Sequence, residues 1–252
     1  MNILIILLRS LYLLAGIIAI FYIPWYYSLA GYFLVALCNG VAAHRYFSHD
    51  QFQVNLFGRW MLGFFATVGM YSPINYWIVQ HKHHHRNSDK ENDLHSPNKG
   101  ILHSALLWPF KTDTIQSAFA EKSSVLLLVR ANRDPVIRLY SKHFVLINLT
   151  WLMILLYIDH YIALAYLSGC FLDYIRIGLI NSLCHINVPG SYRNHETLDN
   201  SYNNVVLGII TLGFGWHNNH HYDGKKLLLT ERWWEVDIEG YIGVALSKLL
   251  KS

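Results

Sequence analysis

Histidines gather in three clusters along this chain, and each cluster lies just past a hydrophobic segment. Two of the clusters have the same H-x-x-H-H order, and residues at i, i+3 and i+4 of a helix share one face. Neutral imidazole nitrogens bind zinc, copper, iron and nickel. With one more histidine at the end of an apolar stretch, the candidate ligands are His44, His49, His81, His84, His85, His185, His217, His220 and His221. A tetrahedral site takes four ligands, so this number predicts two metal ions.

Helix geometry predicts different roles for individual residues in and beside these clusters. His44 and His49 are five residues apart, about 140° around an ideal helix, so they converge only if the helix ends or loosens between them. His83 points away from the face that its neighbours share and is predicted not to bind metal. Asn181 lies one helical turn before His185, where an amide without a partner would be costly. We expect Asn181 to hold a metal-bound water, the alternative being an ordinary hydrogen bond between helices.

The composition indicates a membrane protein. Of the 252 residues, 53% are hydrophobic and only 14% are charged, whereas a soluble domain has about a quarter of its residues charged. Four apolar runs approach the roughly 20 residues that a helix needs to cross the hydrocarbon core. The predicted spans are residues 3–22, 26–43, 144–158 and 161–184, arranged as two helical hairpins. We therefore predict an all-α membrane protein of one domain, residues 1–252, with four transmembrane helices and a cytosolic helical cap formed by residues 44–142 and 185–252.

The distribution of charge predicts the orientation of the chain. The two hairpin tips carry no Lys or Arg, and nearly all other basic residues lie in the two long segments, which the positive-inside rule places in the cytoplasm. All candidate ligands then lie on one side of the membrane and can meet. A single H-x-x-H-H cluster is equally typical of a solvated helix face, but two copies on one side favour a metal site. A metal transporter is the less favoured alternative, because its ligands would lie at the bilayer midplane.

Two further segments are interpreted in the light of these spans. Residues 57–71 are apolar but short, so we expect a helix at the membrane interface rather than a fifth crossing. Asp173 and Arg176 lie three residues apart within the fourth span, where charges usually pair, so we expect a structural ion pair. The three cysteines form no C-x-x-C motif and are predicted to be packing residues.

Four longer motifs extend the pattern beyond the histidines. They are HHRNSDKENDLHSP (residues 84–97), NSLCH (181–185), GWHNNHH (215–221) and WWEVD (233–237). Together they resemble the motifs of the membrane fatty acid desaturases, and the acyl-CoA Δ9-desaturase type (stearoyl-CoA desaturase-like) most closely. The resemblance covers about residues 30–245, and its specificity comes from the combination and order of the motifs.

The resemblance implies a non-haem di-iron enzyme. In that family two iron ions are bound by histidines matching the nine candidate ligands above, and the position of Asn181 holds a water on one iron. Such an enzyme uses O2 and two electrons to take two hydrogens from a saturated acyl chain, which leaves a cis double bond. An apolar tunnel would suit this chemistry, because exclusion of water contributes about 0.8 kcal/mol per buried CH2.

The resemblance also implies a set of partners. Acyl-CoA is favoured as the acyl carrier, with an acyl carrier protein or a membrane lipid as alternatives that could also meet a chain of net charge +4. Electrons are expected from a separate protein of the ferredoxin or cytochrome b5 type. No nucleic-acid partner is expected. The bacterial inner membrane is favoured over the endoplasmic reticulum as the location.

One departure from the family pattern bears on the substrate. The family often has a Thr-Trp pair three to four residues before the asparagine, where this chain has Ile177 and Gly178. Loss of the large ring is expected to widen the site locally. The main alternative to a desaturase is therefore a hydroxylase or another oxidase with the same di-iron chemistry.

Overall fold

The computed structural model describes residues 3–251, and nearly all of its regular structure is helical. Three helical runs are long and apolar enough to cross a membrane: α1 (Ile3–Tyr22), α2 (Trp25–Leu37) with the π-helix η1 (Cys38–Ser48) that continues it, and α9 (His160–Leu183). Pro24 separates α1 from α2, since proline has no N–H to continue a helix. These candidate spans coincide with the first, second and fourth predicted spans, and the second extends further than predicted.

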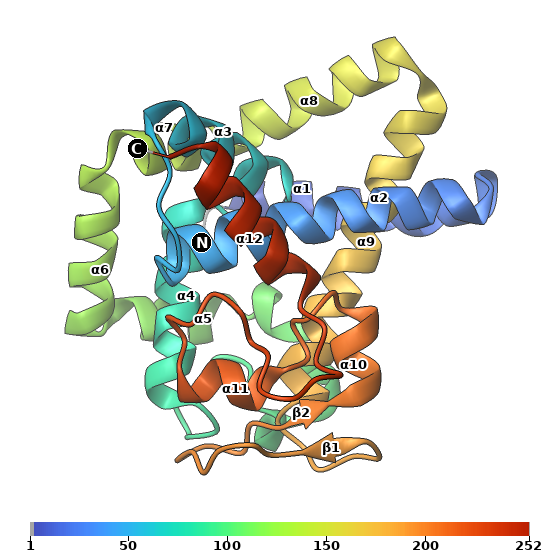
Figure 1. Ribbon diagram of the computed structural model, residues 1–252. Coiled ribbons are helices and arrows are strands. Elements are labelled where there is room, and N and C mark those ends of the chain that lie inside the picture. The colour runs from blue at the N-terminus through green and yellow to red at the C-terminus, as the bar shows by residue number, and fades with distance from the viewer. Residues whose placement is uncertain (1–2, 252) are drawn as a thin grey trace.

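The third predicted span is the shortest. α8 (Phe144–Ile158) has 15 residues, which is about 22 Å of helix against a hydrocarbon core of about 30 Å. It follows α7 (Pro135–Lys142) at a bend of 70°, and only the two helices together pass as a span. The described residues therefore contain three candidate spans, or four if the bent pair counts as one. Figure 1 shows α8 reaching outward before the chain turns back into α9.

α9 is the central helix among these spans, because it packs against both α1 and α2. Gly31 of α2 lies directly against the backbone of Ala165 and Gly169 of α9, where a Cβ would clash. Small residues at such crossings let helix backbones approach closely in a membrane. One helix of the second predicted hairpin thus holds both helices of the first.

The charged residue of α1 is buried rather than turned to lipid. Arg9 donates hydrogen bonds to the carbonyl oxygens of Pro109, at 3.1 Å, and of Tyr71. Pro109 belongs to the single turn η4 (Trp108–Phe110), which is outside the spans. An arginine in a span is tolerated where it pairs inside the protein, and here it ties α1 to the rest of the chain.

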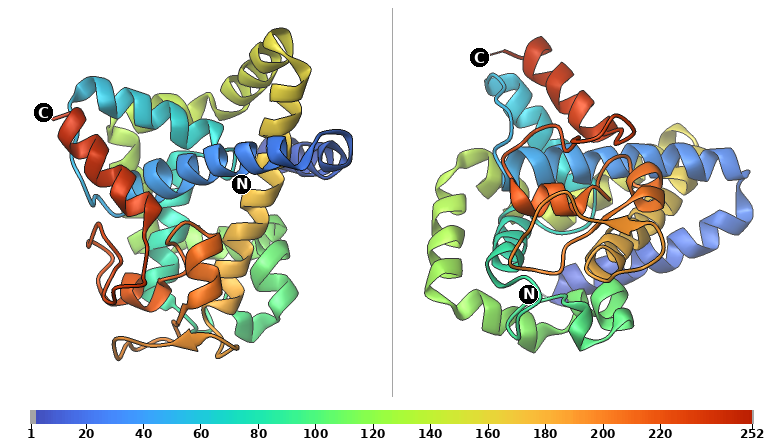
Figure 2. Two further views of the ribbon diagram at one scale, coloured as in Figure 1. Left: turned by 45° about the vertical axis from the view of Figure 1, so that its right-hand side comes forward. Right: turned by 60° about the horizontal axis from the view of Figure 1, so that its bottom comes forward.

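The remaining elements form a cap of short helices. They are α3 (Leu56–Val68), α4 (Ile74–Asn87), η2 (Pro97–Lys99), η3 (His103–Leu107), α5 (Thr112–Ala120), α6 (Lys122–Arg133), α10 (Val205–Ile210), α11 (His217–Tyr222) and α12 (Ile238–Leu249). β1 (Ser191–Tyr192) pairs antiparallel with β2 (Asn203–Asn204). α3 has only 13 residues, as expected for a helix that does not cross the membrane. Figure 2 shows α4 and α11 near the middle of the cap, with α6 on the outer side of α4.

A buried network of charges joins α9, η1 and the start of α12. Arg176 Nε lies 2.6 Å from Asp173 Oδ1, which confirms the predicted ion pair, and Arg176 Nη1 lies 2.6 Å from Glu239 Oε1. Arg45 Nη2 lies 2.7 Å from Asp237 Oδ1. All five side chains are almost completely buried. Arg45 is part of η1 and lies between His44 and His49 in the chain. The network therefore fixes the turn of η1 that leads to His49.

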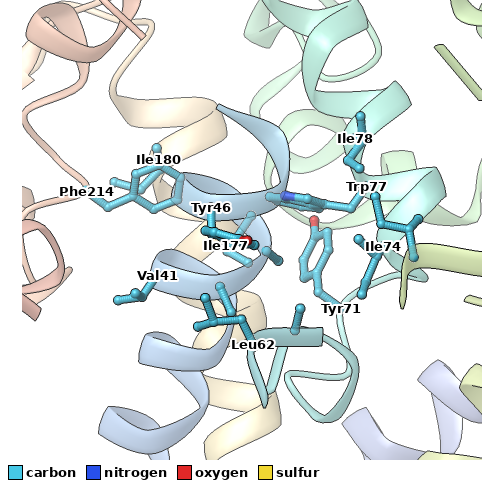
Figure 3. Close-up of a cluster of buried hydrophobic side chains, with 14 of the residues drawn as sticks. Val41, Tyr46, Leu62, Tyr71, Ile74, Trp77, Ile78, Ile177, Ile180 and Phe214 are labelled. Carbon is cyan, nitrogen blue, oxygen red and sulfur yellow. The ribbon is translucent and has the colours of Figure 1, made fainter. Parts of the chain in front are cut away.

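Figure 3 shows the hydrophobic cluster where η1, α3, α4 and α9 meet, with Phe214 reaching it from the loop before α11. Ile177 is fully buried in this cluster. The expectation that Gly178 widens the site is wrong at this position. A Cβ on Gly178 would clash with the carbonyl of Ala105, because η3 packs directly on α9 and fills the place of a large ring.

Candidate metal centre

The first histidine pair converges because η1 is a π-helix. Hydrogen bonds from i to i+5 bring residues five apart close together along the helix, and the N–H of His49 donates to the carbonyl of His44 at 3.1 Å. The two ring centroids are 4.8 Å apart. This is the loosening that the five-residue spacing required.

The two H-x-x-H-H clusters lie on α4 and α11. The first occupies the C-terminal half of α4, where the i, i+3, i+4 spacing turns three imidazoles to one side. α11 is only six residues long, His217 to Tyr222, and consists almost entirely of the second cluster. His185 follows the end of α9, and its N–H donates to the carbonyl of Ser182 at 3.3 Å. Four separate elements therefore supply the candidate ligands.

One group of histidines, which we call site A, consists of His44, His49, His81 and His220, whose ligand nitrogens all lie within 4.8 Å of one another. The Nε2 atoms of His49 and His81 are 2.6 Å apart, and those of His44 and His220 are 3.2 Å apart. His85 Nε2 is 3.0 Å from Nε2 of both His81 and His220, so His85 lies at site A too. Two nitrogens bound at right angles to one ion at about 2.1 Å are about 3 Å apart. The geometry therefore fits a shared cation.

The second group, site B, consists of His84, His185, His217 and His221, again with all ligand nitrogens within 4.8 Å. The Nε2 atoms of His185 and His217 are 3.1 Å apart. The sites are neighbours, since the rings of His85 at site A and His221 at site B stack at 4.5 Å between centroids. His83 lies outside both groups, with Nε2 2.8 Å from the carbonyl oxygen of Asn92. The fold thus brings all nine candidate ligands to two adjacent positions.

Burial lowers the pKa of histidines at both sites, which favours the neutral imidazole there. Burial lowers the pKa of His81 well below its usual value, and the neighbouring His85 and His49 lower it further. Burial is also the largest cause that lowers the pKa of His84. Among the described residues, Nε2 of His84 and Nε2 of His221 are buried without a hydrogen-bond partner. Buried nitrogen lone pairs that face one another at such distances are costly without a cation, so the residues fit two metal ions.

Three aspartates bind the Nδ1 atoms of site-B histidines, on the side of each ring away from the metal position. The Nδ1–H groups donate in three pairs: His84 to Asp93 Oδ1 at 3.0 Å, His185 to Asp89 Oδ2 at 2.9 Å, and His221 to Asp199 Oδ2 at 2.6 Å. Such a bond fixes the tautomer and leaves Nε2 free to bind metal. Burial is the largest single influence on the pKa of Asp199 and raises it, but the interactions with His221 and the hydrogen bonds from Ser201 and Thr197 together outweigh burial and hold that pKa well below its usual range.

Site A has a different environment. Among the described residues, no site-A histidine forms an ion pair with a carboxylate, and Nδ1 of His44 and of His220 has no hydrogen-bond partner. At site B only His217 lacks a partner for Nδ1. The nearby ammonium of Lys82 lowers the pKa of His49 further, after burial and two histidines. Site A therefore lacks the hydrogen-bonded carboxylates that site B has, within the described residues.

Asn181 lines a small cavity that touches both sites. The cavity has a volume of about 10 Å³, enough for one water molecule. Its lining residues are Trp77, Gln80, His81, His84, His95, Trp108, Asn181, Phe214 and His217. Sequence reasoning missed His95, whose ring centroid is 4.0 Å from that of His84 and which forms a third possible ligand group with His84 and Asp93. The only signal in the sequence was its place in the motif of residues 84–97.

A larger cavity of about 620 Å³ lies between α2, η1, α3, α8, α9 and α12. Its walls are almost entirely aliphatic and aromatic, with Leu62, Leu155 and Ile242 on three of these elements. Val41 and Ala42 of η1 line it as well, three and two residues before His44 along the chain. The protein thus has an apolar space that begins within one helical turn of site A.

The chain matches the fatty acid desaturase family over residues 17–226. It is 29% identical over 221 residues to the Delta-9 desaturase-like 4 protein of Arabidopsis thaliana, covering 86% of this chain and 71% of the relative. It is 33% identical over 211 residues to Delta-9 acyl-lipid desaturase 1 of the same plant, covering 80% of this chain and 65% of the relative. It is 25% identical over 230 residues to the icosanoyl-CoA 5-desaturase of Limnanthes douglasii, covering 88% of this chain and 63% of the relative. Because the matched residues contain every histidine of sites A and B, the chain belongs to the fatty acid desaturase family, as a multi-pass membrane oxidoreductase with a histidine-rich di-metal site.

Proposed function

We propose that this protein is an O2-dependent di-iron desaturase that inserts a cis double bond into the saturated chain of an acyl-CoA. The observation that carries the proposal is the convergence of nine imidazoles on two adjacent positions, with Nε2 atoms of neighbouring histidines 2.6 to 3.2 Å apart. Imidazole is a common ligand of iron in proteins. A site without anionic ligands in direct contact differs from the carboxylate-rich di-iron bundles.

Each predicted ligand has a place in the proposal. Site A holds one iron through His44, His49, His81, His85 and His220, and site B holds the other through His84, His185, His217 and His221. Asn181 positions a water beside site B, which the water-sized cavity along its side chain supports. When bound, the two irons supply the oxidising power, drawn from O2, that removes two hydrogens from the acyl chain. The surrounding side chains hold the ligands and exclude bulk water.

The large apolar cavity supports an acyl chain as the substrate. Its lining surface is almost entirely apolar, so a methylene chain would be bound by exclusion of water, at about 0.8 kcal/mol per buried CH2. A chain in this space has its inner end near η1 and site A, because Val41 and Ala42 line the cavity. The depth of the cavity would then determine which carbon pair is oxidised.

The acyl carrier, the orientation of the protein in the membrane and the electron donor belong to the same proposal. One relative is named for an acyl-CoA and another for an acyl-lipid, and we favour the CoA ester because the motifs of the chain resemble those of the acyl-CoA Δ9-desaturase type most closely. The positive-inside rule supports sites that face the cytoplasm. A single domain, residues 1–252, in a bacterial inner membrane completes the proposal. A separate ferredoxin or cytochrome b5 type protein would deliver the electrons.

Expression in a host without desaturases, followed by mass spectrometry of total fatty acids, tests the proposal. The expected result is new cis monounsaturated chains that disappear with His84→Ala and persist with His83→Ala, since His83 lies outside both sites. Supplying labelled acyl-CoA or labelled phospholipid to membranes with a reductase system identifies the carrier by which pool is desaturated first. Hydroxylated chains in place of monoenes would contradict desaturation, and label appearing first in phospholipid would contradict the CoA ester.

A further inference from the structure

The two metal positions differ in what supports their ligands. Three of the four site-B histidines donate Nδ1–H to an aspartate, whereas no described carboxylate pairs with a site-A histidine. We propose that Asp89, Asp93 and Asp199 are positioning residues that make site B the more tightly binding iron site and favour the higher oxidation state there. This inference rests on the proposed function, because it assumes one iron at each site.

The aspartates are themselves held in place, so they can hold the imidazoles. Asp93 is fully buried, and it accepts the backbone N–H of Asp89 at 2.9 Å and of His95 at 3.2 Å. Asp89 Oδ2 also accepts the backbone N–H of Asn200 at 2.8 Å. One loop thus carries two linked carboxylates, and each faces a different site-B histidine.

Asp199 is fixed from a second loop. Its Oδ1 accepts hydrogen bonds from Thr197 Oγ1 at 2.7 Å, from Ser201 Oγ at 2.6 Å and from the backbone N–H of Ser201 at 3.1 Å. Its Oδ2 is left for His221 Nδ1. Three carboxylates from two loops therefore point at one metal position, an arrangement that a merely structural salt bridge does not require.

The physical consequence is a difference of charge between two adjacent sites. A carboxylate hydrogen-bonded to a ligating imidazole raises the basicity of the ligand and fixes its orientation. Negative charge close to an ion stabilises the ion more as its own charge increases. At site A the ammonium of Lys82 lies near His49, the Arg45 guanidinium is already paired with Asp237, and the carboxylate of Asp199 acts on His85 only without a hydrogen bond. Removal of a single aspartate should therefore weaken site B by about 10–100-fold in metal affinity and leave site A unchanged.

Substitution by asparagine separates charge from geometry, because the amide oxygen can still accept the Nδ1–H. We would load the full-length protein in detergent with ⁵⁷Fe, dialyse it against a series of chelator concentrations, and record iron per chain and Mössbauer spectra. The wild type should release its two irons in two steps, and stepwise chemical reduction should reduce the more tightly held iron last. The iron at site B should instead be lost first in each of three variants, Asp89→Asn, Asp93→Asn and Asp199→Asn. The Mössbauer signal of the iron at site A should remain in all of them.

Glu121→Gln is the matched control. Glu121 lies 3.4 Å from Nδ1 of His83, a histidine of the same cluster that belongs to neither site, so this variant should keep both irons. Asp199→Glu, which retains the charge, should bind iron at site B more tightly than Asp199→Asn. Equal loss of both irons in the three asparagine variants, or unchanged affinity in all of them, would overturn the inference. A folded wild type that takes up no iron would instead overturn the proposed function.

Discussion

Sites A and B use the same kind of ligand and share the helices α4 and α11, but the protein holds them in different ways. At site B the support is local charge, from aspartates bonded to His84, His185 and His221. At site A the support is backbone geometry, because the π-helix η1 brings the first histidine pair together and the network around Arg45 fixes η1. Different substitutions should therefore disable the two sites separately.

Removal of one ligand from either site is expected to have the largest effect. His84→Ala should lose iron from site B and His49→Ala from site A, and each should reduce desaturation below detection, since the chemistry needs both irons. His83→Ala should retain both irons and most of the activity, because His83 bonds to the Asn92 carbonyl instead. Iron analysis and fatty acid profiling measure these outcomes. Similar losses in the His83 and His84 variants would contradict the assignment of sites.

Arg176→Met is expected to have the next largest effect, on stability. It leaves the buried carboxylate of Asp173 without its cation and leaves Glu239 only Arg45, at 3.7 Å, and breaking a buried pair typically costs about 3–5 kcal/mol. Because the network also holds η1, site A should lose its iron before site B. Chemical unfolding in detergent and iron analysis measure both effects, with exposed Arg138→Met as the control. A variant as stable as the wild type would show that the network contributes little.

Acid should weaken the iron-free protein. Below pH 6.5 the unfolded chain binds protons at histidines whose pKa burial lowers in the folded state, as for His81 and His217. The free energy of unfolding should then fall as the pH falls, by up to about 1.4 kcal/mol per pH unit for each such histidine, and be fully present above pH 6.5. Unfolding of chelator-treated protein between pH 5 and 8 measures this slope, and a flat profile would contradict the burial of neutral imidazoles.

The smallest effect is expected from Gly178→Ala, which tests how η3 supports site B. The new Cβ would meet the carbonyl of Ala105, and overpacking of this kind costs about 1–3 kcal/mol. Ser104, next to Ala105, donates to the carbonyl of Asn181 at 2.9 Å, so the position of Asn181 should shift too. Thermal unfolding and the rate of product formation measure these changes. Unaltered stability, or a tolerated Gly178→Trp, would show that the space is open after all.

The sequence predicted features that depend on local spacing. The spacing of the H-x-x-H-H clusters placed three imidazoles on one helix face, and the five-residue spacing of His44 and His49 required the loosened helix that η1 provides. Asp173 and Arg176 pair as predicted, because i and i+3 are neighbours on any helix. Four apolar runs were also visible, and three of them are long enough to span a membrane.

Features that depend on contacts between distant segments were missed. Asp199 lies 22 residues before His221 in the chain, and nothing in its own segment indicates that it faces a histidine. Gly178 was expected to leave space, but η3 fills it from more than 70 residues away, with Ala105 against the glycine. The bend between α7 and α8 was not visible either, because hydropathy reports length and not direction.

The most direct test of the central claim is the Mössbauer spectrum of the purified wild-type protein loaded with ⁵⁷Fe. Two irons per chain, in two distinct environments of equal intensity, are the predicted result. A single iron per chain, or two irons in one environment, would contradict the account of two unequal histidine sites.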